Sequence, residues 1–217
     1  MLPMRFFKSR GFAATNALSF AMFFGMFGSI FLLAQFFQTV QGYSPLQSGL
    51  RILPWTAMPI FVAPIAGALS DKIGGRPLMG TGLALQAIGL GWMAAIGSPT
   101  TPYGDFVIPF MLSGVGMALF FAPVANVVLS SVKPEEEGKA SGANNAIREL
   151  GGVFGVAVLA TVFNRPGVYS SPSVFVSGFH SALWVAVAFA VAGVALTGFL
   201  KPKTQFVAEL SLESSAA

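Results

Sequence analysis

The sequence predicts an all-α fold, a polytopic membrane helix bundle with six transmembrane helices. Hydrophobic residues make up 54% of the 217 residues and charged residues only 9%, whereas soluble domains carry about 25% charged residues. Six long uncharged runs occur along the chain, each close to the roughly 20 residues that a helix needs to cross a hydrocarbon core of about 30 Å. Charges or turn-forming residues separate these runs, as expected for the connections of a bundle.

The uncharged runs define the expected spans. They cover residues 13–37, 48–70, 78–97, 106–131, 140–163 and 179–200. The connections between them are short, so we expect residues 1–204 to form one six-helix membrane domain. Residues 205–217 are small and polar, which predicts a disordered tail on the cytoplasmic side.

Basic residues gather at one side of the predicted bundle. If the N-terminus is cytoplasmic, the inner side receives Arg5, Lys8, Arg10, Lys72, Arg76, Lys133, Lys139, Lys201 and Lys203. The outer connections then hold only Arg165, while Arg51 and Arg148 lie within apolar runs and are left out of the count. The excess of positive charge on one side predicts a multi-pass protein of the cell (cytoplasmic) membrane with both termini in the cytoplasm.

The composition argues against several classes of site. The chain has no cysteine and one histidine, so it cannot build a disulfide framework, a thiolate nucleophile or a typical zinc centre. No standard catalytic or phosphate-binding motif appears. The net charge of +4 comes from clusters at span ends, which indicates membrane topology and no nucleic-acid partner. We therefore expect no enzyme activity, no cofactor and no metal.

Prolines interrupt two of the predicted spans. The second carries Pro54, Pro59 and Pro64, and the fourth carries Pro109 and Pro123. Membrane helices tolerate such breaks where neighbouring helices or cavity water satisfy the freed carbonyl groups. Bent helices that line a cavity, or kinks that only shape the packing, both fit this pattern.

Small and aromatic residues give weaker indications. Gly151 and Gly155 form a G-x-x-x-G pair, which indicates that two helix backbones approach closely, and we expect this within the bundle. Lipid contact is the default expectation for the 22 phenylalanines, although some could line an apolar cavity. Trp55 is expected to join the aromatic belt at the membrane interface.

The fifth run holds the most informative polar residues. Arg148 follows Lys139 by nine residues, or about 14 Å of helix, which places it near the bilayer midplane. A charge at that depth is costly and indicates function by default. Asn144 shares a helix face with Arg148, and Asn145 shares a different face with Glu149. One face could contact a substrate while the other braces a neighbouring helix.

The connection after the second run has a recognisable pattern, the signature loop, whose matching residues are Gly67, Leu69, Ser70, Asp71, Lys72, Gly74 and Arg76. It resembles the motif G-x-L-[small]-D-[basic]-x-G-[basic]-[basic] of the major facilitator superfamily, which joins the second and third helices of each six-helix half. Gly75 departs from the motif where the family usually has a base. The resemblance implies that Asp71 and Arg76 join a charge network that braces opposite halves. A simple solvated hairpin is the alternative.

The chain as far as residue 200 resembles the last six helices of the fourteen-helix drug:proton antiporters of that superfamily. The similar segments are residues 6–12, residues 42–54 and the fifth run with Arg148 and its paired glycines. The resemblance implies the C-terminal half of a transporter that exports drugs or other amphipathic compounds against protons. In that group the arginine is the more regular position, while its neighbour is often an amide, so whether Glu149 carries protons stays open.

A single half implies partners. A facilitator fold places its substrate between two six-helix halves. We therefore expect the lipid bilayer, a small-molecule substrate, protons, and either an N-terminal transporter half or a second copy of the chain as partners. A truncated product, a split half and a homodimer all stay open. So does a nonfunctional or accessory six-helix fragment that needs a second half.

Overall fold

The computed structural model describes residues 4–164 and 171–199. All regular elements in these ranges are helices, as the sequence predicts. They are α1 (Arg10–Gln35), α2 (Pro45–Thr56), α3 (Met58–Ile73), α4 (Gly75–Ile96), α5 (Tyr103–Leu129), α6 (Glu137–Asn164) and α7 (Pro172–Leu196). α2 and α3 together form one crossing, so these ranges contain 6 candidate membrane spans. The predicted tail, residues 205–217, lies outside the described residues.

The second predicted span is two helices with Ala57 between them. Pro59 lies in the first turn of α3, where the missing N–H has no intrahelical partner to lose. Pro54 and Pro64 lie inside α2 and α3. The structure therefore shows the break that these three prolines predict.

Most helix ends lie within a few residues of the predicted ones, and two regions differ more. α7 begins at Pro172, seven residues before the predicted start at 179, because Ser171 caps it by accepting a hydrogen bond from the Val174 amide. The predicted connection between the second and third spans is almost entirely helical, with only Gly74 separating α3 from α4. Gly74 has a φ of 86°, a conformation that favours glycine over other residues.

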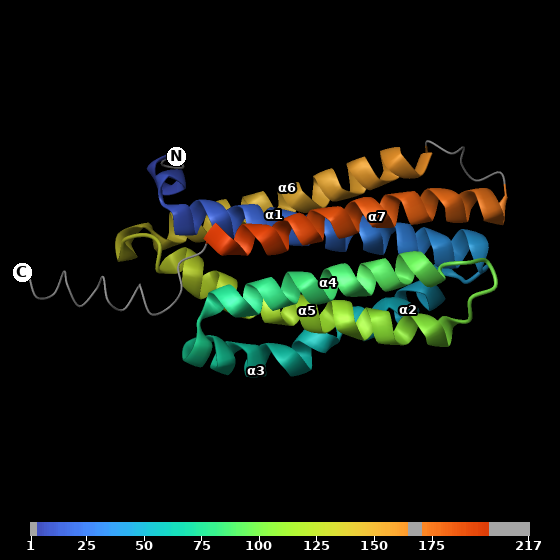
Figure 1. Cartoon of the computed structure of the whole chain (residues 1–217), viewed down its shortest axis with the longest axis horizontal. Coiled ribbons are helices and arrows are strands. Elements are labelled where there is room, and N and C mark those ends of the chain that lie inside the picture. The colour runs from blue at the N-terminus through green and yellow to red at the C-terminus, as the bar shows by residue number, and fades with distance from the viewer. Residues whose placement is uncertain (1–3, 165–170, 200–217) are drawn as a thin grey trace, which may run out of the picture.

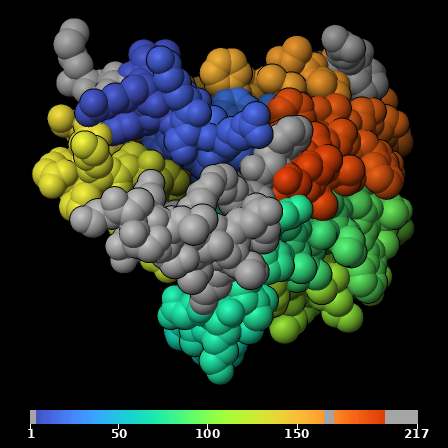
Figure 2. Space-filling model, turned by 60° about the vertical axis from the view of Figure 1, so that its left-hand side comes forward, coloured from blue at the N-terminus to red at the C-terminus, as the bar shows by residue number. Residues whose placement is uncertain are grey.

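The helices are packed in two interlocked groups. α1 packs mainly on α6 and α7, and α5 packs mainly on α4 and α3, while α4 also contacts α7. All helices run along the long axis of the molecule, with the start of α1 and the end of α7 at the same end (Figure 1). In the view onto that end, the segment around the α3–α4 junction projects from the rest of the bundle (Figure 2).

Glycines allow the closest helix contacts. A Cβ atom on Gly151 would lie 2.6 Å from the carbonyl oxygen of Phe20, and one on Gly155 would collide with the backbone of Phe24. The G-x-x-x-G pair therefore brings α6 against α1 inside one bundle, which confirms the expected close packing.

Phenylalanine side chains fill much of the interior. The buried ones in the described part of the chain are Phe6, Phe12, Phe23, Phe24, Phe36, Phe37, Phe106, Phe110, Phe120, Phe163, Phe175 and Phe179. Trp55 is also fully buried, with its ring centroid 6.2 Å from that of Phe110. The expectations of lipid contact for these phenylalanines and of an interfacial position for Trp55 were wrong. Lipid is as apolar as the bundle interior, so hydrophobicity alone does not decide which of the two a ring contacts.

Candidate functional site

Arg148 lies in the middle of α6 and reaches toward two other helices. Its guanidinium carbon is 4.5 Å from the ring centroid of Phe23 on α1 and 4.8 Å from that of Phe121 on α5. The two rings are themselves 5.4 Å apart. A guanidinium over aromatic faces is held by the attraction between its charge and the ring quadrupoles. The structure therefore places a cation where α1, α5 and α6 meet.

The guanidinium keeps hydrogen-bonding capacity in this position. Its Nε atom is buried and has no hydrogen-bond partner among the described residues. Aromatic faces attract the charge but accept N–H bonds only weakly, and an arginine carries five N–H donors. The site can therefore bind a carboxylate, a carbonyl group or water without first breaking a salt bridge.

Asn144, one turn before Arg148, has a different role. It is buried, and its side-chain amide donates hydrogen bonds of 3.1 Å to Asn16 Oδ1 and 3.1 Å to Ser19 Oγ on α1. Asn16 in turn donates to the carbonyl oxygen of Phe12 at 2.8 Å. Asn144 therefore fixes α6 to α1, and of the predicted pair only Arg148 retains free donors.

Asn145 and Glu149 are exposed on another side of α6. Val153, four residues after Glu149, accompanies them there with 65% exposure. An ionised carboxylate deep in a membrane is very unfavourable against lipid. This face of α6 therefore needs protein or water beside it. Glu149 is exposed, whereas its sequence neighbour Arg148 is half-buried, so the two side chains leave α6 in different directions.

The signature loop lies at the end of the bundle that carries the N-terminus. Gly67, Leu69, Asp71 and Lys72 belong to the last turns of α3, Gly74 is the link, and Arg76 is the second residue of α4. Leu69, Asp71 and Lys72 are exposed, whereas Gly67, Gly74 and Arg76 are half-buried. The motif is therefore a tight helix-to-helix corner at the surface of the unit.

Gly75, the departure from the family motif, has a packing explanation. A Cβ atom on this residue would lie 2.9 Å from Val127 Cγ2 and 3.1 Å from Pro123 Cβ on α5. A basic side chain at this position would push α4 away from α5. Close contact between these helices accounts for the glycine.

Arg51 forms a second cationic site that the sequence did not identify. Its guanidinium carbon lies 3.5 Å from the ring centroid of Tyr43 and 5.4 Å from that of Tyr103. The Tyr103 hydroxyl donates a 3.1 Å hydrogen bond to the Arg51 carbonyl oxygen. These contacts join α2 to the start of α5. A base within an apolar run was the only local signal, because Tyr103 is 52 residues away in sequence.

Comparisons with known proteins agree with this architecture. The profile of the Major Facilitator Superfamily matches residues 2–156. The chain is 34% identical over 162 residues to the multidrug resistance protein Stp of Mycobacterium tuberculosis, covering 75% of this chain and 30% of that protein. It is 29% identical over 170 residues to the multidrug export protein EmrB of Escherichia coli, covering 78% and 33%. It is 27% identical over 208 residues to the riboflavin transporter RibZ of Clostridioides difficile, covering 94% and 45%.

The fold is also similar to a solved structure. A chain from work on substrate recognition in proton dependent oligopeptide transporters superposes with a TM-score of 0.78 at 18% identity, over 94% of this chain and 46% of that one. The chain thus spans less than half the length of the proteins it matches. The family match and the helical bundle together show that this multi-pass membrane chain belongs to the Major Facilitator Superfamily and is a six-helix half of that fold.

Proposed function

We propose that the chain is one half of an alternating-access transporter that exports drugs or other amphipathic compounds in exchange for protons. The observation that carries the proposal is Arg148, a mid-helix cation that two aromatic rings hold and whose Nε has no acceptor in the described chain. The similarity to a multidrug resistance protein and a multidrug export protein, Stp and EmrB, supports the substrate class. The riboflavin transporter shows that a related chain can serve a different compound.

Arg148 can couple proton movement to substrate binding through its charge. A fixed cation favours the ionised form of a carboxylate that pairs with it and repels a cationic substrate until that carboxylate is present. To alternate between proton and substrate, the carboxylate must pair with the guanidinium in one state and leave it in the other. Arg148 forms no salt bridge with a described residue, so it is able to change partners in this way. Glu149 points elsewhere, so the acidic partner comes from the substrate cavity or from the other half.

The other half covers the exposed faces of α3 and α6. Ile60 and Phe61 on α3 are 72% and 66% exposed, and Glu149 is exposed on α6. We propose that a second six-helix unit in the same orientation packs there, with the termini of this chain in the cytoplasm and the complex in the cell membrane. An accessory fragment that awaits such a unit is the second candidate, which the same exposed faces favour.

The test is export across an imposed pH gradient in vesicles that contain the complete transporter. We expect a fluorescent cationic dye to move with the gradient and to stop when a protonophore is added. Arg148→Ala should abolish export at near-normal protein level, because it removes the cation that the two rings hold. Ala95→Leu, on the exposed side of α4 away from the proposed partner half, is the matched control. Dye export that does not depend on the gradient would rule out proton coupling.

The identity of the second unit is tested by disulfide cross-linking. The chain has no native cysteine, so Val153→Cys on the exposed face of α6 introduces a single thiol. A disulfide-linked dimer supports a second copy of the chain, provided that Ala95→Cys on the exposed side of α4 gives none. A monomer in an active complex supports a separate N-terminal half.

A further inference from the structure

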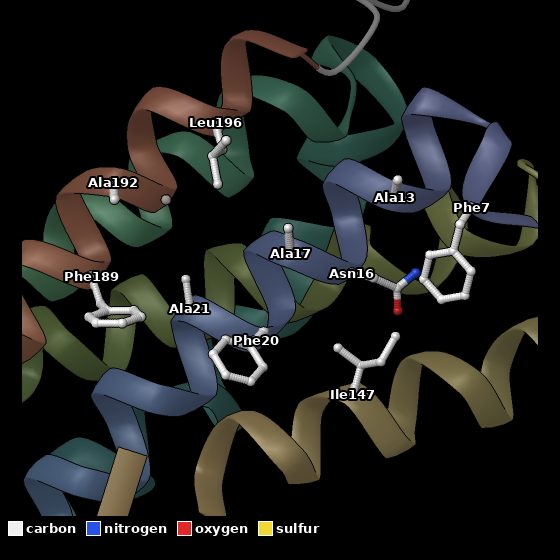
Figure 3. Close-up of a pocket in the computed structure, with 11 residues that line it drawn as sticks. Phe7, Ala13, Asn16, Ala17, Phe20, Ala21, Ile147, Phe189, Ala192 and Leu196 are labelled. Atoms are coloured by element: carbon white, nitrogen blue, oxygen red, sulfur yellow. The ribbon is translucent and has the colours of Figure 1, made fainter. Parts of the chain in front are cut away.

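An apolar groove of about 560 Å³ lies between α1, α6 and α7, near the end of the bundle that carries the start of α1 (Figure 3). Small side chains on α1 and α7 give it its width, with Phe189 and Leu196 beside them. The residues that line the groove include Ala13, Ala17 and Ala21 of α1, Ile147 of α6, and Ala192 of α7. Asn16 is the polar side chain at the wall, and its amide already bonds to Asn144 and to the Phe12 carbonyl. The groove therefore offers apolar contact.

The dimensions of the groove match one leaflet of a bilayer. Ala13 and Ala21 are eight residues apart on α1, a rise of about 12 Å. Half of a hydrocarbon core of about 30 Å is close to this length. Ala17 and Ala192 are exposed at the surface of the unit, so the groove opens sideways where lipid is the solvent.

The groove faces away from the proposed partner half. Ile147, which lines it, and Glu149, on the exposed face of α6, are two residues apart and therefore about 200° apart around the helix. A second six-helix unit on the Glu149 side leaves the groove uncovered. Lipid is then the neighbour that the groove meets.

Basic residues flank the lining residues of the groove in the sequence. Phe7 lines the groove and Lys8 follows it, while Arg10 lies three residues before Ala13 and seven before Ala17, on the same face of α1. Lys8 and Arg10 are exposed, and neither forms an ion pair with another described residue. The positive end of the α1 dipole adds to their field.

The acidic residues near this end do not cancel that charge. Glu135, Glu136 and Glu137 precede or begin α6, and Glu136 is already paired with Arg5. Lys133 and Lys139 flank Glu135 and Glu137 in the sequence and balance their charges, so Lys8 and Arg10 leave this end of the bundle positive. Phosphate groups of anionic lipids are attracted to such basic clusters beside membrane helices.

We propose that the groove binds one acyl chain of an anionic phospholipid and that Lys8 and Arg10 bind its phosphate. The proposal requires that the chain is inserted in a membrane and does not depend on the transported compound. The lipid would fill the space between α1 and α7 that protein side chains leave open.

Native mass spectrometry of the purified chain in detergent tests this, with phosphatidylglycerol and phosphatidylcholine added in equal amounts. We expect the chain to retain phosphatidylglycerol in preference. Ala17→Phe should fill the groove and remove the preference, whereas Ala157→Phe, exposed on α6 outside the groove, should keep it. Lys8→Gln and Arg10→Gln should each weaken the preference about fivefold.

Two further variants test whether the effects are specific to the groove and whether they come from misfolding. Lys72→Gln removes an exposed cation on α3, away from the groove, and should leave the preference unchanged. If Ala17→Phe does not fold, Ala192→Leu on the opposite wall replaces it. Equal retention of the two lipids by the wild type would overturn the proposal. So would an unchanged preference in the folded groove variant, or an equal loss in Lys72→Gln.

Discussion

Replacing Arg148 with methionine should separate its functional role from a structural one. Methionine retains an unbranched apolar stem and a sulfur that packs well against aromatic rings. It removes the charge and every N–H donor. We expect Arg148→Met to leave the fold nearly unchanged and to abolish proton-coupled export in the complete transporter.

The contacts of the guanidinium determine the expected magnitude. Two ring faces at 4.5 and 4.8 Å contribute about 0.5–1 kcal/mol each in a half-exposed setting, so about 1–2 kcal/mol is lost. The buried Nε without a partner costs about 1–3 kcal/mol, which the substitution recovers. The free energy of unfolding should therefore change by between a loss of about 1 kcal/mol and a gain of about 2 kcal/mol. Transport should fall at least tenfold, and Arg148→Lys should restore it only in part because lysine lacks the planar fork.

The assay compares thermal unfolding in detergent with dye export from vesicles, at equal membrane abundance. Ala95→Met, on the exposed side of α4, controls for the introduction of a methionine at a helix surface. Normal export by Arg148→Met would refute the role in coupling. A loss of more than about 3 kcal/mol of stability, beyond the range for a single half-exposed contact, would show that the guanidinium is structural.

Three further predictions test topology, the signature loop and the helix contacts. A cysteine at Ser98 should react with an impermeant thiol reagent outside intact cells while one at Glu136 should not, and the reverse pattern would overturn the cytoplasmic N-terminus. Asp71→Asn should reduce transport by the complete transporter at normal membrane insertion, whereas unchanged transport would leave the motif a structural corner. Gly155→Ala should lower the free energy of unfolding by about 1–3 kcal/mol because its Cβ meets a neighbouring backbone. Gly142→Ala, with nothing within 4 Å, is the matched control, and an equal effect of both would contradict the contact.

The sequence predicted the fold class because the relevant signal is local. Hydropathy over about 20 residues determines whether a helix can cross a bilayer, and all six crossings appear where the apolar runs lie. The predicted helix ends were less accurate than the predicted spans, because capping residues as well as hydropathy decide where a helix begins and ends. Ser171 and Pro172 start α7 early, and Gly74 alone turns the chain between α3 and α4.

The candidate site was only partly predictable. Counting residues from the membrane interface identified Arg148, but its ring partners Phe23 and Phe121 come from helices far away in sequence. The same limit hid the contact of Arg51 with Tyr103, which is 52 residues away in sequence. A single sequence does not reveal such contacts, because a phenylalanine that faces lipid and one that faces a guanidinium have the same local sequence pattern.

The geometry of α6 shows how packing and chemistry depend on each other. Asn144, Arg148, Gly151 and Gly155 recur at intervals of four, three and four residues and therefore form one stripe along the helix. The two glycines bring α6 against the backbone of α1, and the Asn144 hydrogen bonds fix its rotation. Only at this separation does the Arg148 stem reach the rings of α1 and α5. Glu149 lies outside the stripe and is therefore exposed to whatever unit completes the transporter.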